Sequence, residues 1–118
     1  MSSEKMLQNI LSALEDAKAQ NVTSIDVRDI TDITDYMVIA SGTSSRHVKS
    51  VADNVAGSLR DAGNKALGTE GESEGEWVLV DFGDVILHVM QQATREHYQL
   101  EKLWGHSAVS RKVSQSAE

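Results

Sequence analysis

The stretch EWVLVDFGDVILHVM, residues 76–90, predicts two antiparallel strands that are joined by a tight turn. Gly83 and Asp84 form a two-residue loop of the kind that hairpins prefer, because glycine accepts the positive φ that such turns require. With this loop, each residue before the turn pairs with one residue after it, and Trp77 lies opposite Met90. The turn therefore sets the register of the whole hairpin.

This register sorts the hairpin residues into two groups, because side chains alternate between the two faces of a strand. One face is entirely aliphatic or aromatic and consists of Val78, Val80, Phe82, Val85, Leu87 and Val89. The other face, called the mixed face below, consists of Trp77, Leu79, Asp81, Ile86, His88 and Met90. The first face is typical of a protein core. The mixed face is apolar enough to need a cover, yet it contains an acid and an imidazole.

Two long segments have the apolar spacing of amphipathic helices. In residues 3–19 the apolar stripe consists of Met6, Leu7, Ile10, Leu11, Leu14 and Ala17. In residues 44–62 it consists of Val48, Val51, Ala52, Val55 and Leu59. Gly63 follows the second segment as a stop signal. A third, shorter helix is predicted for residues 94–104.

Three further strands are predicted outside the hairpin, at residues 24–29, 35–41 and 66–68. The acidic, glycine-rich segment 69–75 (TEGESEG) is expected to be a loop. Strand 35–41 is the most apolar of the three, so it is expected to be central. A right-handed crossover is expected to lead from it through the second helix to the strand near Leu67.

These elements predict an α/β (α+β) fold in which a five-stranded mixed sheet carries two long helices on one face and a short C-terminal helix. The two long helices would cover the aliphatic face of the hairpin, which leaves little of the chain to cover the mixed face. A single domain is expected for residues 1–105, followed by a disordered polar tail at residues 106–118.

The composition limits the classes of function. Eleven basic and 18 acidic residues give a net charge of −7, which favours a basic partner and argues against direct nucleic-acid readout. There is no run of about 18 apolar residues that would predict a membrane span, and no signal peptide is recognisable. The chain contains no cysteine, which excludes disulfides, thiol catalysis and thiolate metal sites. A cytoplasmic location is therefore expected.

Two features suggest enzymes without completing a catalytic set. The turn from Ser41 to Ser45 (SGTSS) places hydroxyl and backbone N–H groups at a helix N-terminus, where a phosphate could bind. It lacks the Gly-Lys-Ser/Thr of a Walker A loop, and no paired metal-binding acids follow, so N-capping is favoured. A small nucleotide-binding or nucleotidyltransferase-like enzyme that uses this turn is the alternative. His88 could act as a general base near Asp81, but no nucleophile accompanies it.

The aromatic residues favour an interaction surface. Tryptophan usually belongs to a core, but strand alternation places Trp77 opposite the helix-covered side. Tryptophan and tyrosine anchor many protein interfaces, and a neighbouring methionine adds an adaptable contact. The four histidines do not have the spacing of a zinc site. We therefore expect a binding protein without catalytic residues, metal or cofactor, and a homodimer interface on the mixed face is a further alternative.

Three blocks of the sequence resemble the ribosomal silencing factor family, also called Iojap-like. They are DITDYMVIASGTSSRHVKSVADNV, which ends at Val55, the hairpin segment quoted above, and REHYQLEKLWG at residues 95–105. The resemblance covers residues 7–105 and implies a nucleotidyltransferase-like topology without the catalytic acids. It also implies binding to a basic protein of the large ribosomal subunit, the fourteenth, on the face that meets the small subunit. Blocked subunit joining would repress translation during nutrient limitation, and the free protein could be a homodimer.

The resemblance also implies which residues bind the partner. Trp77, with Asp81, His88 and Met90 around it, resembles the contacting sheet surface of the family. A second group matches the C-terminal block that joins this surface, and it consists of Tyr98, Leu100 and Glu101. The resemblance implies no catalytic residue, no metal and no cofactor.

Overall fold

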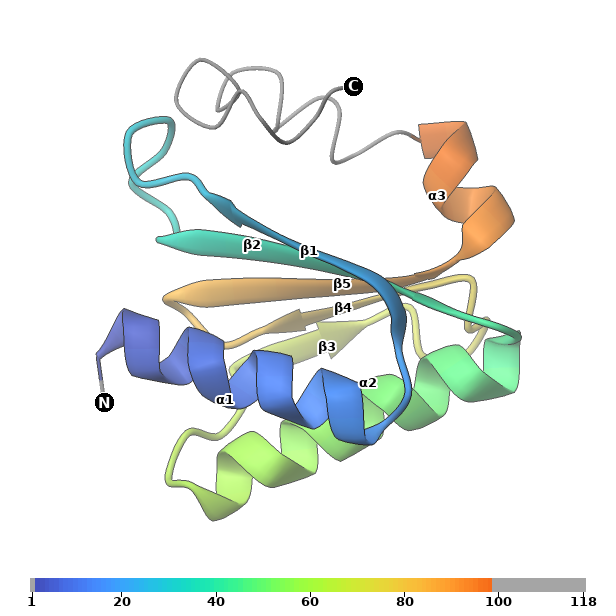
Figure 1. The fold of residues 1–118 in the computed structure, drawn as a ribbon, viewed down its shortest axis with the longest axis horizontal. Coiled ribbons are helices and arrows are strands. Elements are labelled where there is room, and N and C mark those ends of the chain that lie inside the picture. The colour runs from blue at the N-terminus through green and yellow to red at the C-terminus, as the bar shows by residue number, and fades with distance from the viewer. Residues whose placement is uncertain (1, 99–118) are drawn as a thin grey trace.

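The computed structural model describes residues 2–98, which form three helices and five strands. The helices are α1 (Ser3–Asp16), α2 (Ser45–Asp61) and α3 (Gln92–Tyr98). The strands are β1 (Gln20–Asp26), β2 (Tyr36–Gly42), β3 (Gly68–Glu70), β4 (Trp77–Asp81) and β5 (Val85–Gln91). They form one sheet in the order β1-β2-β5-β4-β3, with α1 and α2 together on one side (Figure 1). The predicted α+β fold with a five-stranded mixed sheet is confirmed.

The hairpin register agrees with the prediction from its turn. Trp77 lies opposite Met90, and Leu79 lies opposite His88. Gly83 has a φ of 90°, and its backbone N–H donates a hydrogen bond of 2.8 Å to a carboxylate oxygen of Asp81. β4 and β5 pair antiparallel, whereas β2 and β5 pair parallel, so β5 lies between two strands of opposite direction.

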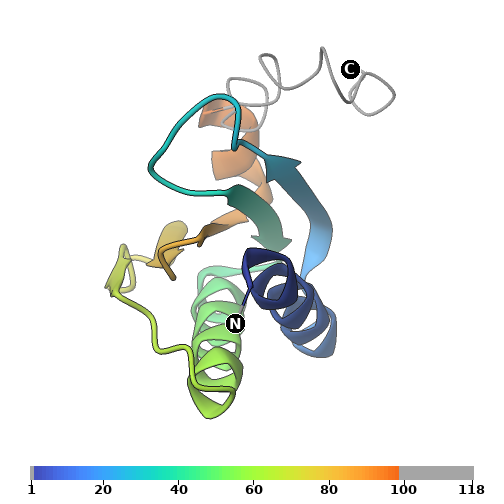
Figure 2. The same ribbon diagram turned by 90° about the vertical axis from the view of Figure 1, so that its left-hand side faces the viewer.

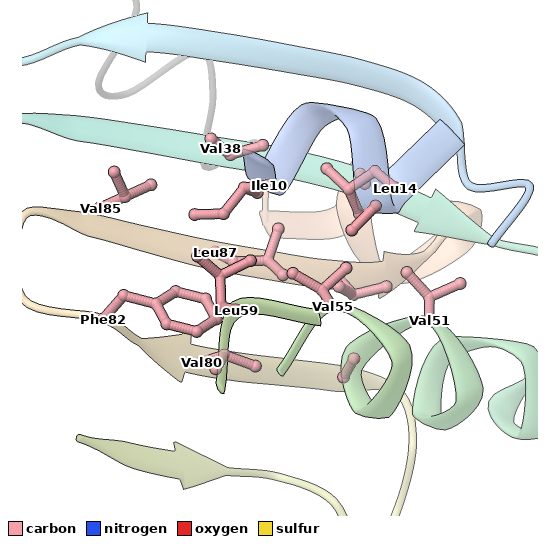
Figure 3. Packing of buried hydrophobic residues seen from close by; sticks show 14 of the residues in the cluster. Ile10, Leu14, Val38, Val51, Val55, Leu59, Val80, Phe82, Val85 and Leu87 are labelled. Atoms are coloured by element: carbon pink, nitrogen blue, oxygen red, sulfur yellow. The ribbon is translucent and has the colours of Figure 1, made fainter. Parts of the chain in front are cut away.

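The main core lies between the sheet and the two long helices. Figure 3 shows Ile10, Leu14, Val55 and Leu59 of the helices against Leu87 and neighbouring strand residues. All five of these side chains are fully buried. Burial of one such side chain is worth about 1.5–3 kcal/mol, so this layer supplies most of the hydrophobic driving force. Most of its residues are those that the helical stripes and the aliphatic hairpin face predicted, and β2 adds Tyr36, Val38 and Ala40, whereas Leu11 and Ala17 are only partly buried.

Both long helices begin at a serine that accepts a backbone hydrogen bond. Ser2 Oγ accepts from the Lys5 N–H over 3.1 Å, and Ser44 Oγ accepts from the His47 N–H over 3.1 Å. These bonds satisfy N–H groups that have no partner within the helix. α2 ends before Gly63, whose φ of 92° stops the helix as expected.

Three boundaries differ from the prediction. β1 begins and ends earlier than residues 24–29, and its register with β2 shifts between Gln20 and Thr23. β3 replaces the strand predicted at residues 66–68, because its pairing with β4 takes in the start of the expected loop at 69–75. β3 is also separated from β2 by β5 and β4, so the connection through α2 passes over two strands.

The C-terminal helix begins two residues before the predicted start at Thr94, directly after β5. The predicted continuation to residue 104 and the tail at residues 106–118 lie outside the described residues. None of the three described helices combines the length and the hydropathy that a bilayer crossing requires. Figure 2 shows that α3 and the connection between β1 and β2 rise on the side of the sheet opposite α1 and α2.

Candidate functional site

The mixed face lies on this second side of the sheet, and part of it forms a small core. Met90 is fully buried in a cluster with Ile25, Val27, Met37 and Ile39. Trp77 packs against this cluster and is half-buried. The cluster exists because the parallel pairing of β2 with β5 adds the side chains of a third and a fourth strand to the face that the hairpin begins.

The expectation that the mixed face has little cover is therefore wrong at two positions. Met90 has no exposed surface, and His88 is 5% exposed. Both residues lie on β5, a central strand whose neighbours β2 and β4 crowd its side chains from both sides. Neither side chain can meet a partner directly in this conformation. The exposed part of the face lies at Trp77, Leu79, Asp81 and Ile86, which are all half-buried.

Trp77 and His88 form a polar contact on this face. The indole Nε1–H donates a hydrogen bond of 2.9 Å to Nδ1 of His88, and the ring centroids are 5.8 Å apart at an angle of 50°. Because Nδ1 accepts, the proton of the neutral imidazole is on Nε2. Nε2 is buried and has no hydrogen-bond partner in the part of the chain that the structure describes. Burial lowers the pKa of His88 to about 4, so the ring is neutral near pH 7.

Asp81 is not the partner of this histidine. Its carboxylate accepts the Gly83 N–H and thereby stabilises the hairpin turn. The idea of a general base formed by His88 and Asp81 therefore has no geometric support. Residues 2–98 also contain no group of three or more acidic or histidine side chains that could hold a metal ion.

Arg95 of α3 lies at the edge of the mixed face and is 6% exposed. Its guanidinium donates to the Asn21 carbonyl over 2.6 Å, to Ser41 Oγ over 2.8 Å and to Thr23 Oγ1 over 3.2 Å. The Ser41 hydroxyl in turn donates to Gln92 Oε1 over 3.1 Å. These bonds connect α3 to β1 and β2 at the irregular part of β1, where Asn21 has a φ of 50°. A buried arginine of this kind has no signal in hydrophobic periodicity, and the sequence interpretation missed it.

The C-terminal block begins at this attachment. Tyr98 is the last described residue of α3, and the structure does not describe its side chain. Leu100 and Glu101 lie outside the described residues. The partner-binding roles of these three residues therefore stay predictions, as do those of Trp77 and Asp81.

The turn from Ser41 to Ser45 uses its polar groups within the protein. Ser44 caps α2, and the Thr43 N–H donates to Nδ1 of His47 over 2.9 Å. Nε2 of His47 lies 3.1 Å from the Ala17 carbonyl oxygen, so the same ring connects the start of α2 to the end of α1. The predicted capping role is confirmed. Ser41 itself belongs to the Arg95 network.

Comparisons with known proteins agree with this fold. The family model described as "Ribosomal silencing factor during starvation" (RsfS) matches residues 1–118. Ribosomal silencing factor RsfS of Chromobacterium violaceum is 41% identical over 105 residues, which cover 89% of this chain and 86% of that protein. The protein of the same name from Haemophilus influenzae is 41% identical over 99 residues, which cover 84% of this chain and 97% of that protein.

A more distant relative and two solved structures extend this result. The mouse protein named "Mitochondrial assembly of ribosomal large subunit protein 1" is 36% identical and covers 80% of this chain, which spans 43% of that protein. A crystal structure of a Chromobacterium violaceum protein has a TM-score of 0.87 and 41% identity, and the match covers 89% of this chain and 88% of that chain. A Bacillus halodurans crystal structure has a TM-score of 0.78 and 33% identity, with 86% and 94% coverage.

Proposed function

The chain belongs to the ribosomal silencing factor family, and on that basis we propose that it represses translation by binding the large ribosomal subunit and blocking the small subunit sterically. The proposed partner is a basic protein of the large subunit. The proposed setting is the cytoplasm during nutrient limitation. Under this condition, fewer small and large ribosomal subunits should join. No catalytic step is needed, because a bound domain of this size obstructs docking by its volume alone.

The half-exposed part of the mixed face is the observation that carries this proposal. Trp77 and Leu79 are two residues apart on β4 and so point to the same side, and Ile86 of β5, which pairs with Asp81, lies on the same face diagonally from Leu79. These three partly exposed apolar side chains, called the contact stripe below, lie on a side of the sheet that α1 and α2 do not cover. A tryptophan in such a stripe is the side chain that most often anchors a protein interface.

Charge supports a basic partner. The chain has a net charge of −7, and two acids lie at the hairpin end of the stripe, where Asp81 is half-buried and Asp84 is exposed. Complementary potentials raise association rates and select against acidic partners. An interface of about 800 Å² on each partner is the usual size for a specific complex. Tyr98, Leu100 and Glu101 are proposed to add to this surface from the C-terminal block.

A subunit-joining assay tests the proposal. Purified small and large subunits are mixed, and light scattering reports their association with and without this protein. We expect slower and less complete joining, accompanied by co-sedimentation of the protein with the large subunit. Unchanged joining at protein concentrations that saturate the large subunit would overturn the mechanism, and failure to co-sediment would overturn the partner.

Self-association on the same face gives a different result. A homodimer that uses the stripe at Trp77 would compete with the ribosomal partner, so the inhibition of joining would rise less steeply with protein concentration above the dimer dissociation constant. Sizing across a dilution series measures that constant directly. The enzyme alternative at Ser41–Ser45 gains no support from the geometry, because Thr43 and Ser44 are occupied in capping α2.

A further inference from the structure

His88 lowers the stability of the fold at its position. Its neighbours across the sheet are Leu79 on β4 and Ile39 on β2, so an aliphatic side chain would suit the surroundings. The imidazole instead loses its hydration and leaves the Nε2–H buried without an acceptor among the described residues. A buried donor without an acceptor lowers stability. The side chain therefore needs a reason other than the stability of the fold.

The polar contact that the ring makes within the described residues points to that reason. Nδ1 accepts the indole N–H of Trp77 over 2.9 Å, from a residue that lies diagonally across the β4–β5 pair. Trp77 is half-buried and belongs to the proposed contact stripe. The bond therefore restricts the rotation of an indole in that stripe.

We propose that His88 is a positioning residue, whose Nδ1 holds the Trp77 indole in the orientation that the ribosomal partner binds. This inference rests on the proposed function and adds to it the residue that orients the anchor, Trp77. An anchor that is ordered before binding loses less conformational freedom when the complex forms. His88 itself stays beneath the surface and acts through Trp77.

Three variants separate this role from a structural one. His88→Leu removes the acceptor and also the unpaired N–H. His88→Asn keeps an acceptor oxygen near the position of Nδ1. Trp77→Phe keeps an aromatic ring but removes the donor. For each variant, urea unfolding gives the stability, co-sedimentation with large subunits gives Kd, and the exchange of the indole N–H with water, followed by NMR, reports the hydrogen bond.

The expected result is a separation of stability from binding. His88→Leu should be at least as stable as the wild type, exchange its Trp77 indole N–H faster and bind about three- to tenfold more weakly. His88→Asn should recover most of that affinity. In the Trp77→Phe background, His88→Leu should cause no further loss, because the donor that the histidine holds is already absent.

Several outcomes would overturn the inference. Wild-type affinity in His88→Leu would show that the orientation of the indole does not matter for binding. Unfolding of His88→Leu, or a loss of affinity that only follows its loss of stability, would show that the histidine serves the fold. Absence of any binding by the wild type would instead overturn the proposed function, and with it the premise of this inference.

Discussion

Arg95 and Ser41, which are 54 residues apart in the sequence, form a buried hydrogen bond of 2.8 Å between Nη1 and Oγ. Ser41 lies near the end of the central strand β2, and Arg95 lies in the short helix α3. Together with the bonds to the Asn21 carbonyl and to Thr23, this contact holds α3 against β1 and β2. The described part of the C-terminal block is therefore held against the sheet.

We predict that Arg95→Ala lowers the free energy of unfolding by about 2 kcal/mol or more, because the change leaves buried acceptors unpaired. Amide exchange of α3 should accelerate more than exchange of α2. Urea unfolding and hydrogen exchange measure the two effects. Arg46→Ala is the matched control, since Arg46 is exposed on α2 and its change should stay within about 0.5 kcal/mol. Equal effects of the two substitutions would contradict the role of the Arg95 network.

The main core predicts that replacing two leucines with alanine changes the stability by very different amounts. Leu87 is fully buried beneath the helices, whereas Leu67 is 73% exposed next to the hairpin turn. Leu87→Ala should destabilise the protein by about 2–5 kcal/mol, because it removes buried methyl groups and leaves a cavity. Leu67→Ala should change the stability by less than about 0.5 kcal/mol. Chemical denaturation of both variants checks the assignment of the helix-covered face.

The buried imidazole predicts a loss of stability in acid. Burial lowers the pKa of His88 from 6.5 to about 4, so between these values the unfolded chain binds a proton that the folded chain does not. The contribution is fully present above pH 6.5 and is lost as the pH falls toward 4, by up to about 3 kcal/mol. The stability difference between the wild type and His88→Leu, measured from pH 7 to pH 4, isolates this contribution. A difference that stays constant with pH would contradict it.

The contact stripe predicts a binding defect without unfolding. Trp77→Ala should weaken binding to the large subunit by about 2 kcal/mol or more, as truncation of an interface anchor commonly does. Circular dichroism should show an intact fold, since the indole is only half-buried. Asp53→Ala, on the exposed face of α2, is the control and should bind like the wild type. A folded Trp77→Ala variant that binds with wild-type affinity would remove Trp77 from the interface.

Local geometry explains which parts of the fold could be predicted. The Gly83-Asp84 turn sets the hairpin register, and the 3.6-residue spacing of Val48, Val51 and Val55 identifies the buried side of α2. These signals depend on residues close together in the chain. The ends of β1 and β3 were predicted less well, because a strand extends as far as its partner continues to pair with it.

The candidate site could be predicted only in part. Alternation correctly placed Trp77, Asp81, His88 and Met90 on one face of the hairpin, but it carried no information on which strand would lie beside β5. The parallel pairing with β2 is a non-local contact, and it converts part of that face into a second core. Arg95 was missed for the same reason, since its acceptors come from β1 and β2.

The amino-acid sequence by itself determined the two amphipathic helices, the hairpin register and the lack of thiol chemistry, because each depends on local spacing or on composition. Only the tertiary structure decided that His88 and Met90 are buried while Trp77 stays half-exposed. The physical reason is that burial depends on which strands become neighbours. β2 and β5 lie side by side in the sheet, although α2, β3 and β4 separate them in the sequence.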